Sequence, residues 1–183
     1  GGKAAYIFHS LKTERPQDYF LANEISEHRA ELVSQVIPKA HVHVGGGQNL
    51  QHFPVFDRIL VDAPCSGLGA LRRRPEASWR KTRDDLKNLV ALQRDLLDSA
   101  SALLSDSGII AYVTCSPHLA ETRLQVADFL HRKKSFEILS LASFIPEQVN
   151  HALNKDGSLQ LWTDVDNSDA MFMVLFQRKD LHA

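Results

Sequence analysis

Short apolar runs and longer amphipathic stretches alternate along the chain. Residues 58–61 and 109–113 form mostly apolar runs that end in polar clusters, which is typical of buried strands in a parallel sheet. Further strands are predicted at residues 19–24, 42–44, 137–139, 159–162 and 171–176. Strands separated by helical segments predict an α/β fold.

The helical segments show apolar side chains at the spacing of one helix face. One helix is predicted to begin at Ser26, and another near Glu121. The longest helix is predicted from about residue 84 to 104, with Gly108 ending it. Its apolar stripe comprises Leu86, Leu89, Val90, Leu96, Leu97, Ala100, Leu103 and Leu104.

Composition indicates one compact domain over residues 1–183. The chain is 44% hydrophobic and 23% charged, with a formal net charge of −1. It has no apolar run of the roughly 18 residues that cross a bilayer and no signal-peptide pattern, so we expect a cytoplasmic protein. The nine histidines, including His41 and His43, lack metal-ligand spacing, and we predict no metal site.

The two cysteines carry the clearest chemical signal. Cys65 lies in the segment Asp62-Ala63-Pro64-Cys65-Ser66-Gly67, and Cys115 lies in Thr114-Cys115-Ser116-Pro117. Each follows a predicted strand, and the carboxyl ends of parallel strands meet at the ligand-binding edge of a sheet. We therefore expect the two thiols to meet over one pocket. Read singly, each cysteine is equally compatible with a small, half-buried apolar residue.

These motifs resemble those of the RNA 5-methylcytosine methyltransferases, the family of the bacterial Sun/Fmu enzymes and their eukaryotic nucleolar relatives. The matching residues are 56–69, 73–76, Leu92-Gln93 and 112–116. The resemblance implies a Rossmann-like S-adenosylmethionine-dependent methyltransferase fold, with a mostly parallel sheet and an antiparallel C-terminal edge. It also implies that this chain begins after the first strand of that fold.

The resemblance further implies methyl transfer from S-adenosylmethionine to carbon 5 of cytosine in RNA, with ribosomal RNA as the expected substrate. In the family, the residue at Cys115 attacks carbon 6 of the ring, and the residue at Cys65 assists release of the product. Asp62 would contact the cytosine edge. A free thiol, with a pKa of about 8.5, is only slightly ionised at neutral pH, so we expect the site to lower the Cys115 pKa.

The resemblance also assigns a cofactor site. Gly1, Gly2 and Lys3 match the second half of a glycine-rich turn that opens the first helix, and Glu24 matches the acid that accepts the ribose hydroxyls. Read alone, Glu24 is equally an ordinary helix-start carboxylate beside Ser26.

Three further positions complete the implied cofactor site. Asp62 and Pro64 of the Pro-Cys motif belong to it, and Gly46 stands where the family has an aspartate near the adenine amino group. Glycine accepts no side-chain hydrogen bond, so we expect weaker adenine recognition unless Gln48 or a backbone carbonyl substitutes.

A basic segment lies between the cysteine motifs. Basic groups beside an aromatic ring suit a phosphate backbone and an unstacked base, although such runs are also common on solvated faces. Because the net charge is −1, we expect a further N-terminal RNA-binding domain in the parent protein. The predicted RNA-binding residues are Arg72, Arg73, Arg74, Trp79, Arg80 and Lys81.

Two other functions remain open at this point. His118 follows the Cys115 motif and is a candidate general base, which would make the protein a cysteine-histidine hydrolase. The second alternative is a non-catalytic RNA- or nucleotide-binding remnant of the methyltransferase fold. We also expect this chain by itself to bind S-adenosylmethionine poorly or not at all.

Overall fold

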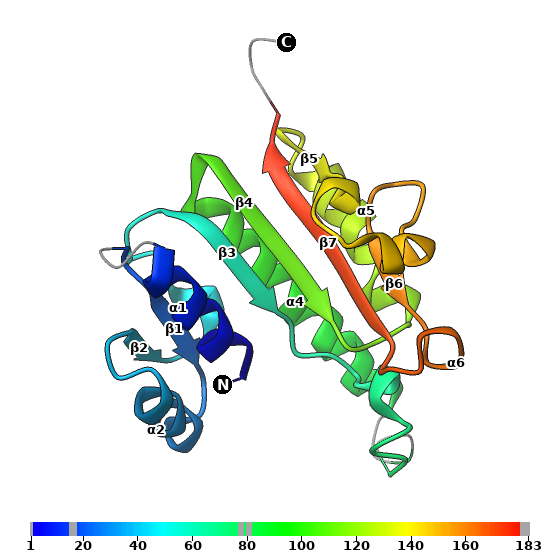
Figure 1. Cartoon of the computed structure of the whole chain (residues 1–183), viewed down its shortest axis with the longest axis horizontal. Helices are drawn as coiled ribbons and strands as arrows, with labels where there is room; N and C mark the ends of the chain where they lie inside the picture. The colour runs from blue at the N-terminus through cyan, green and yellow to red at the C-terminus, as the bar shows by residue number, and fades with distance from the viewer. Residues whose placement is uncertain (1, 15–17, 77–78, 80–81, 180–183) are drawn as a thin grey trace. The chain divides into compact units, whose positions relative to one another are not determined.

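The computed structural model describes residues 2–14, 18–76, 79 and 82–179 (Figure 1). The chain divides into two compact units, residues 1–52 and 53–183. Each unit has its own sheet and its own apolar core. That the two units act as one catalytic domain stays a prediction.

The first unit combines two parallel strands with two helices. α1 (Gly2–Glu14) precedes β1 (Leu21–Glu24), and α2 (Glu27–Val36) connects β1 to its partner β2 (His41–Val44). α2 begins as predicted at Ser26, whose side chain accepts a hydrogen bond from the Arg29 N–H. The core of this unit is formed by Phe8, Ala22, Val33 and Ile37.

The second unit is built on a five-stranded sheet (Figure 1). Its strands are β3 (Phe56–Asp62), β4 (Leu104–Thr114), β5 (Phe136–Leu139), β6 (Leu159–Leu161) and β7 (Met171–Arg178), with α6 (Thr163–Asp166) between β6 and β7. Their spatial order is β3-β4-β7-β5, and β6 also pairs with β7. β3 and β4 are parallel, whereas β7 is antiparallel to β4, β5 and β6. The predicted antiparallel C-terminal edge is confirmed.

Alternating side chains of β4 and β7 face two apolar layers. On one face, Ile110 and Tyr112 of β4 pack with α4 (Arg83–Leu103) and α5 (Arg123–Arg132). On the other face, Ala111 and Leu175 pack with the turns η4 (Leu141–Ser143) and η5 (Glu147–Ala152). β4 and β7 are therefore covered on both faces, whereas β3 exposes Asp57, Arg58, Leu60 and Asp62, so the prediction of a buried strand at residues 58–61 is only partly correct.

α4 is close to the predicted helix, but its end differs from the prediction. It begins at a capping box in which Thr82 and Asp85 exchange hydrogen bonds. Gly108 does not end it, because the helix stops at Leu103 and β4 begins at the next residue. Leu103 and Leu104 are both buried, and this burial turns the chain from helix into strand without a glycine. Among the described residues, no helix is long and apolar enough to span a membrane.

Candidate active site

Both cysteines lie where neighbouring strands end. β3 and β4 are paired with Asp62 beside Val113; Cys115 directly follows β4, and Cys65 follows β3 by three residues. Their sulfur atoms are 3.1 Å apart, so the expectation that the two thiols meet is confirmed. Both thiols are free and partly buried, and their separation exceeds the roughly 2.05 Å of a disulfide.

The contact between the sulfurs alters their ionisation. The pKa of Cys65 is raised well above its ordinary value, first by the hydrogen bond with Cys115, then by burial and by the charge on Cys115. Backbone hydrogen bonds from Gly67 and Cys115 act in the opposite direction without offsetting this. When one thiol of such a pair ionises, the other can donate a hydrogen bond to it, and the raised pKa favours Cys65 as the group that stays protonated.

The raised pKa of Cys65 predicts an order of alkylation. Between about pH 7 and 9, iodoacetamide should label Cys115 before Cys65, because the raised pKa keeps Cys65 protonated. In Cys115→Ala, the main cause of that raised pKa is gone, so Cys65 should become reactive at lower pH than in the wild type. Mass spectrometry after timed alkylation checks both outcomes, with the chain in denaturant as the control. Labelling of Cys65 first, or an unchanged Cys65 profile in the variant, would contradict the assignment.

Gly69 joins three backbone segments at the site. It lies in the turn η2 (Leu68–Ala70); its N–H donates to the Cys115 carbonyl at 3.0 Å, and its own carbonyl accepts from the Ala170 N–H at 2.9 Å. A Cβ at this position would lie 2.1 Å from the Ala170 oxygen and 2.8 Å from the Cys115 oxygen. Only glycine lets these segments approach so closely.

Gly69→Ala should therefore disturb the thiol pair. The added methyl group meets backbone atoms that cannot rotate away, and overpacking of this kind costs about 1–3 kcal/mol. Gly67→Ala is the matched control: Gly67 has φ +73°, so alanine is strained by about 1–2 kcal/mol, but its Cβ would meet no atom within 4 Å. Urea unfolding should show a loss of stability in both variants. Only Gly69→Ala should lose the order of cysteine alkylation; the same order in both variants would refute this role.

The predicted RNA-binding arginines begin directly after η2. The Arg73 guanidinium donates to both carboxylate oxygens of Asp169, and Arg72 donates to Asn167 Oδ1 at 2.6 Å. The pKa of Arg73 is raised, first by Asp169 and to a smaller extent by Cys115. Because a charge interaction acts on both partners, Arg73 favours a thiolate at Cys115.

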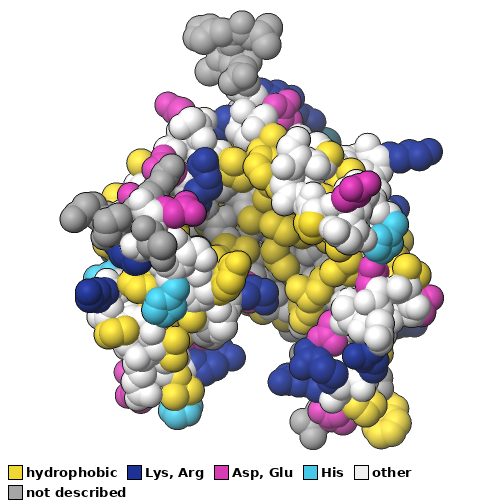
Figure 2. All heavy atoms as spheres, in the orientation of Figure 1, with side chains coloured by type: hydrophobic (Ala, Val, Ile, Leu, Met, Phe, Trp, Pro, Cys, Tyr) yellow, Lys and Arg dark blue, Asp and Glu magenta, His cyan; other side chains and the backbone are white. Residues whose placement is uncertain are grey.

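Other members of the basic segment are exposed. Arg74 is exposed, and Trp79 is 88% exposed. Figure 2 shows Lys and Arg side chains gathered at the lower right, where Figure 1 places the segment after η2. Arg80 and Lys81 lie outside the described residues. The described side chains offer cations and an aromatic face to solvent, as RNA contact requires.

The remaining predicted cofactor residues belong to the first unit. Gly2 and Lys3 are exposed at the start of α1, where helix N–H groups have no helical acceptor, and Gly1 lies outside the described residues. Glu24 ends β1, and its Oε1 accepts from the Ser26 N–H and from Arg29. Both contacts involve Oε1, which leaves Oε2 as the oxygen suited to a ribose hydroxyl.

Gln48 takes the space that a side chain at position 46 would use. Gly46 follows β2, which lies beside β1, and the Gly45 N–H donates to the Glu24 carbonyl. A Cβ on Gly46 would lie 2.7 Å from both Nε2 and Oε1 of Gln48. The Gln48 carboxamide therefore occupies the space that a side chain at position 46 would need.

Asp62 is the last residue of β3, and Pro64 lies in the following turn, directly before Cys65. Asp62 is exposed at the end of the strand, three residues before Cys65. The Pro64 carbonyl accepts a hydrogen bond from Gln93 Nε2 at 2.8 Å, which fixes the residue before Cys65 from α4. Cys65 and the exposed Asp62 carboxylate are therefore held by one strand end.

His118 is not placed as a general base for Cys115. Its Nδ1 accepts a hydrogen bond from the Ala120 N–H at 3.2 Å and caps the turn η3 (Leu119–Glu121). With Nδ1 used as an acceptor, the neutral ring carries its proton on Nε2 and has no free lone pair there. This arrangement argues against the cysteine-histidine hydrolase.

Sequence reasoning missed one group at this site, the carboxylate of Glu121. It is fully buried and accepts hydrogen bonds from the backbone N–H and the hydroxyl of Ser66, at 2.7 and 2.5 Å. Ser66 is the residue after Cys65, 55 positions earlier in the chain. In the sequence, Glu121 resembles an ordinary acid at the start of a helix. The available signal for a shared polar contact was the serine that follows each of the two cysteines.

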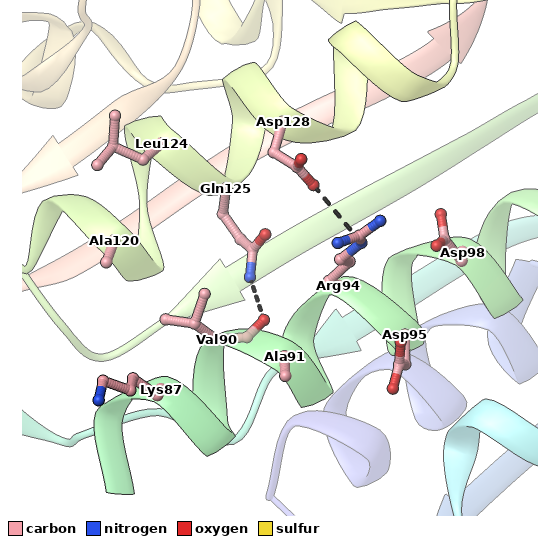
Figure 3. Close-up of a pocket in the computed structure, with 10 residues that line it drawn as sticks. All are labelled: Lys87, Val90, Ala91, Arg94, Asp95, Asp98, Ala120, Leu124, Gln125 and Asp128. Carbon is pink, nitrogen blue, oxygen red and sulfur yellow. Dashed lines mark hydrogen bonds and ion pairs between the residues drawn. The ribbon is translucent and has the colours of Figure 1, made fainter. Parts of the chain in front are cut away.

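A separate groove lies between α4 and α5 (Figure 3). Its volume is ≈ 630 Å³, and Gln125 crosses it to donate to the Val90 carbonyl at 2.6 Å, with Arg94 and Asp128 4.0 Å apart. None of the predicted site residues lines it. The lining residues are Lys87, Val90, Ala91, Arg94, Asp95, Asp98, Ala120, Leu124, Gln125 and Asp128.

Comparison with known proteins identifies the family. The family model of the 16S rRNA methyltransferases RsmB/F matches residues 1–177. The chain belongs to this family. The predicted relationship to the Sun/Fmu enzymes is confirmed, and the family's enzymes are S-adenosylmethionine-dependent methyltransferases.

Curated relatives of the RsmB/F family are longer than this chain. A methyltransferase of Mycobacterium tuberculosis is 46% identical over 160 residues, which are 86% of this chain and 34% of the relative. Ribosomal RNA small subunit methyltransferase B of Photorhabdus laumondii is 31% identical over 98% of this chain and 40% of its own length. The chain thus spans about a third to two fifths of these two relatives.

Similarity to solved structures identifies the fold. NSun6 from Pyrococcus horikoshii, determined with SFG, an analogue of S-adenosylmethionine, has a TM-score of 0.81 at 22% identity and covers 98% of this chain and 46% of its own. TrmN from Thermus thermophilus has a TM-score of 0.56 at 18% identity, covering 94% and 40%. The fold is the Rossmann-like fold of S-adenosylmethionine-dependent methyltransferases, as predicted.

Proposed function

We propose that the protein containing this chain transfers a methyl group from S-adenosylmethionine to carbon 5 of a cytosine in ribosomal RNA, through a covalent adduct between Cys115 and carbon 6. The observation that carries this proposal is the 3.1 Å contact between Cys115 and Cys65 at the carboxyl ends of β3 and β4. Two thiols at one point suit a reaction that needs a nucleophile and a separate proton carrier.

In the proposed reaction, the Cys115 thiolate adds to carbon 6 and pushes an electron pair toward carbon 5. Asp62, exposed at the end of β3, contacts the cytosine edge and favours the protonated ring. Carbon 5 then takes the methyl group and loses its proton, and the electron pair of that C–H bond expels Cys115. Once Cys115 is bonded to carbon 6, Cys65 loses its own proton to solvent and, as a thiolate, receives the carbon 5 proton. Arg73 favours the thiolate form of Cys115 before attack.

We propose cofactor-binding residues in each unit. When bound, S-adenosylmethionine supplies an electrophilic methyl group on its sulfonium. Glu24 Oε2 would accept ribose hydroxyls, and the first amides of α1, at Gly2 and Lys3, would approach the methionine part. The Gln48 carboxamide beside Gly46 would accept from the adenine amino group in place of an aspartate. Asp62 and Pro64 complete the proposed cofactor residues.

RNA is the proposed partner. Arg72, Arg73, Arg74 and Trp79 follow η2, next to the thiol pair through the Gly69–Cys115 hydrogen bond. Arg80 and Lys81, also predicted to bind RNA, lie outside the described residues. A local basic surface on a chain of net charge −1 fits a protein that draws part of its RNA affinity from a further N-terminal domain. A cytoplasmic location remains our expectation.

Loss of one modified base tests the proposal. Mass spectrometry of ribosomal RNA from cells with and without the gene should show one 5-methylcytosine lost on deletion and restored by the wild-type gene but not by Cys115→Ala. Unchanged cytosine methylation after deletion would refute the proposed function, and restoration by the variant would refute the proposed nucleophile.

Calorimetry on this 183-residue chain tests a separate expectation. S-adenosylmethionine should bind it weakly or not at all, whereas the whole protein should bind and transfer methyl groups. An inactive whole protein would favour the non-catalytic remnant. Tight binding to the isolated chain would contradict the expected dependence on the longer protein.

A further inference from the structure

Glu121 is a buried acid with no role in the reaction proposed above. It is 0% exposed, and no Lys or Arg of the described ranges pairs with it. Its carboxylate is satisfied by three donors: the Ser66 N–H, the Ser66 hydroxyl, and Gln93 Nε2 at 3.2 Å. A buried carboxylate satisfied by neutral donors alone carries a desolvation penalty, so its position calls for a physical reason.

The hydrogen bonds at Glu121 determine which group donates and which accepts along a longer series of hydrogen bonds. Because the carboxylate only accepts, the Ser66 hydroxyl donates its single proton to it. The Ser66 oxygen is then the acceptor for the Ser116 hydroxyl, 3.2 Å away, and the Ser116 oxygen accepts from the His118 N–H at 3.1 Å. Ser66 follows Cys65 and Ser116 follows Cys115. This series of hydrogen bonds therefore links the turns that carry the two cysteines.

A second set of bonds holds the other side of the Cys65 turn. Gln93 is fully buried on α4, and its Nε2 donates to the Pro64 carbonyl as well as to Glu121. Tyr112 of β4 places its hydroxyl 2.8 Å from the Glu121 carbonyl. The residues before and after Cys65 are therefore both bound to one buried cluster.

We propose that Glu121 is a positioning residue that holds the Cys65 and Cys115 sulfurs in contact, through Ser66, Ser116 and Gln93. The importance of that contact for methyl transfer rests on the function proposed above. Two acceptor oxygens are required at this position. A glutamine at position 121 would turn an NH₂ group toward one of the donors. Ser66 would then have to reverse its bond, and the link to Ser116 would reverse or break.

The rate of disulfide closure measures the sulfur contact without methyl transfer. In the full chain, diamide takes two hydrogen atoms from the two thiols and becomes the corresponding hydrazine, and mass spectrometry detects the loss of two hydrogens. We expect Glu121→Gln to slow this closure at least about tenfold, and Ser66→Ala and Ser116→Ala to slow it less, because each removes one link. Ser101→Ala is the matched control: Ser101 is also buried, donates to the Asp98 carbonyl at 2.8 Å, and should close at the wild-type rate.

In the whole protein, Glu121→Gln should lower kcat for methyl transfer while the KM for RNA stays near its wild-type value, because the proposed RNA-binding side chains are unchanged. Disulfide closure at the wild-type rate in Glu121→Gln would overturn the proposal, even if the variant were less stable. If that variant does not fold, wild-type closure rates in both serine variants would overturn it. If the wild-type protein transfers no methyl group yet closes its disulfide rapidly, the proposed function fails while the positioning role stands.

Discussion

Cys115→Ala in the whole protein should abolish methyl transfer to RNA, with a fall of at least about 10³-fold, because alanine offers no electron pair to carbon 6. The covalent adduct should disappear in the same variant. RNA carrying 5-fluorocytidine gives the sharper measurement, since a fluorine at carbon 5 cannot leave as a proton does and the adduct persists. A shifted protein–RNA band on a denaturing gel should form with the wild type and be absent with Cys115→Ala.

Ser101→Ala and thermal unfolding serve as controls for the Cys115 variant. Ser101→Ala should form the adduct as the wild type does, and Cys115→Ala should unfold near the wild-type temperature, because Cys115 is only partly buried. An adduct that survives in Cys115→Ala would assign the nucleophile to another residue. A variant that merely unfolds early while retaining activity would leave the cysteine with a packing role alone.

Cys65→Ala should have the opposite effect on the adduct. Without the second thiol, the carbon 5 proton has no acceptor and Cys115 cannot be expelled, so the covalent complex should accumulate on ordinary RNA, where the wild type shows little. Turnover should fall by at least about 10²-fold. Denaturing gels and single-turnover methyl transfer measure the two steps separately.

The double variant completes the comparison of the cysteines. Cys65→Ala combined with Cys115→Ala should show no adduct, because accumulation requires the nucleophile. If Cys65→Ala forms no adduct on ordinary RNA and turns over normally, Cys65 has no part in product release. The contrast between the single variants therefore separates two roles that loss of activity alone would not distinguish.

The sequence predicts most of the scaffold because the signals are local. Apolar runs at residues 58–61 and 109–113 predict β3 and β4, and the end of each strand predicts where its cysteine lies. The antiparallel C-terminal edge and the meeting of the two thiols are confirmed on the same grounds. α4 ends within one residue of the predicted end, but Gly108 lies inside β4 and does not end the helix, which stops where Leu103 and Leu104 are buried.

The rest of the site depends on contacts between distant residues. Glu121 is buried only because Ser66 and Gln93, 55 and 28 positions away, supply its hydrogen bonds. The carboxamide of Gln48 fills the space at Gly46 through a side-chain conformation that no residue pattern encodes. The raised pKa of Cys65 likewise depends on its contact with Cys115, 50 positions away, and on burial, neither of which a residue pattern encodes.

The sulfur contact also couples the protonation of Cys65 to the state of Cys115 during the proposed reaction. While Cys115 is a thiolate, it favours the protonated form of Cys65, and a protonated Cys65 cannot act as a base. Once Cys115 bonds to carbon 6, its charge and its acceptor strength are gone, so the Cys65 pKa falls toward that of an ordinary thiol. Cys65 can then release its own proton to solvent and accept the carbon 5 proton as a thiolate, so the contact between the sulfurs sets the order of the two proposed steps.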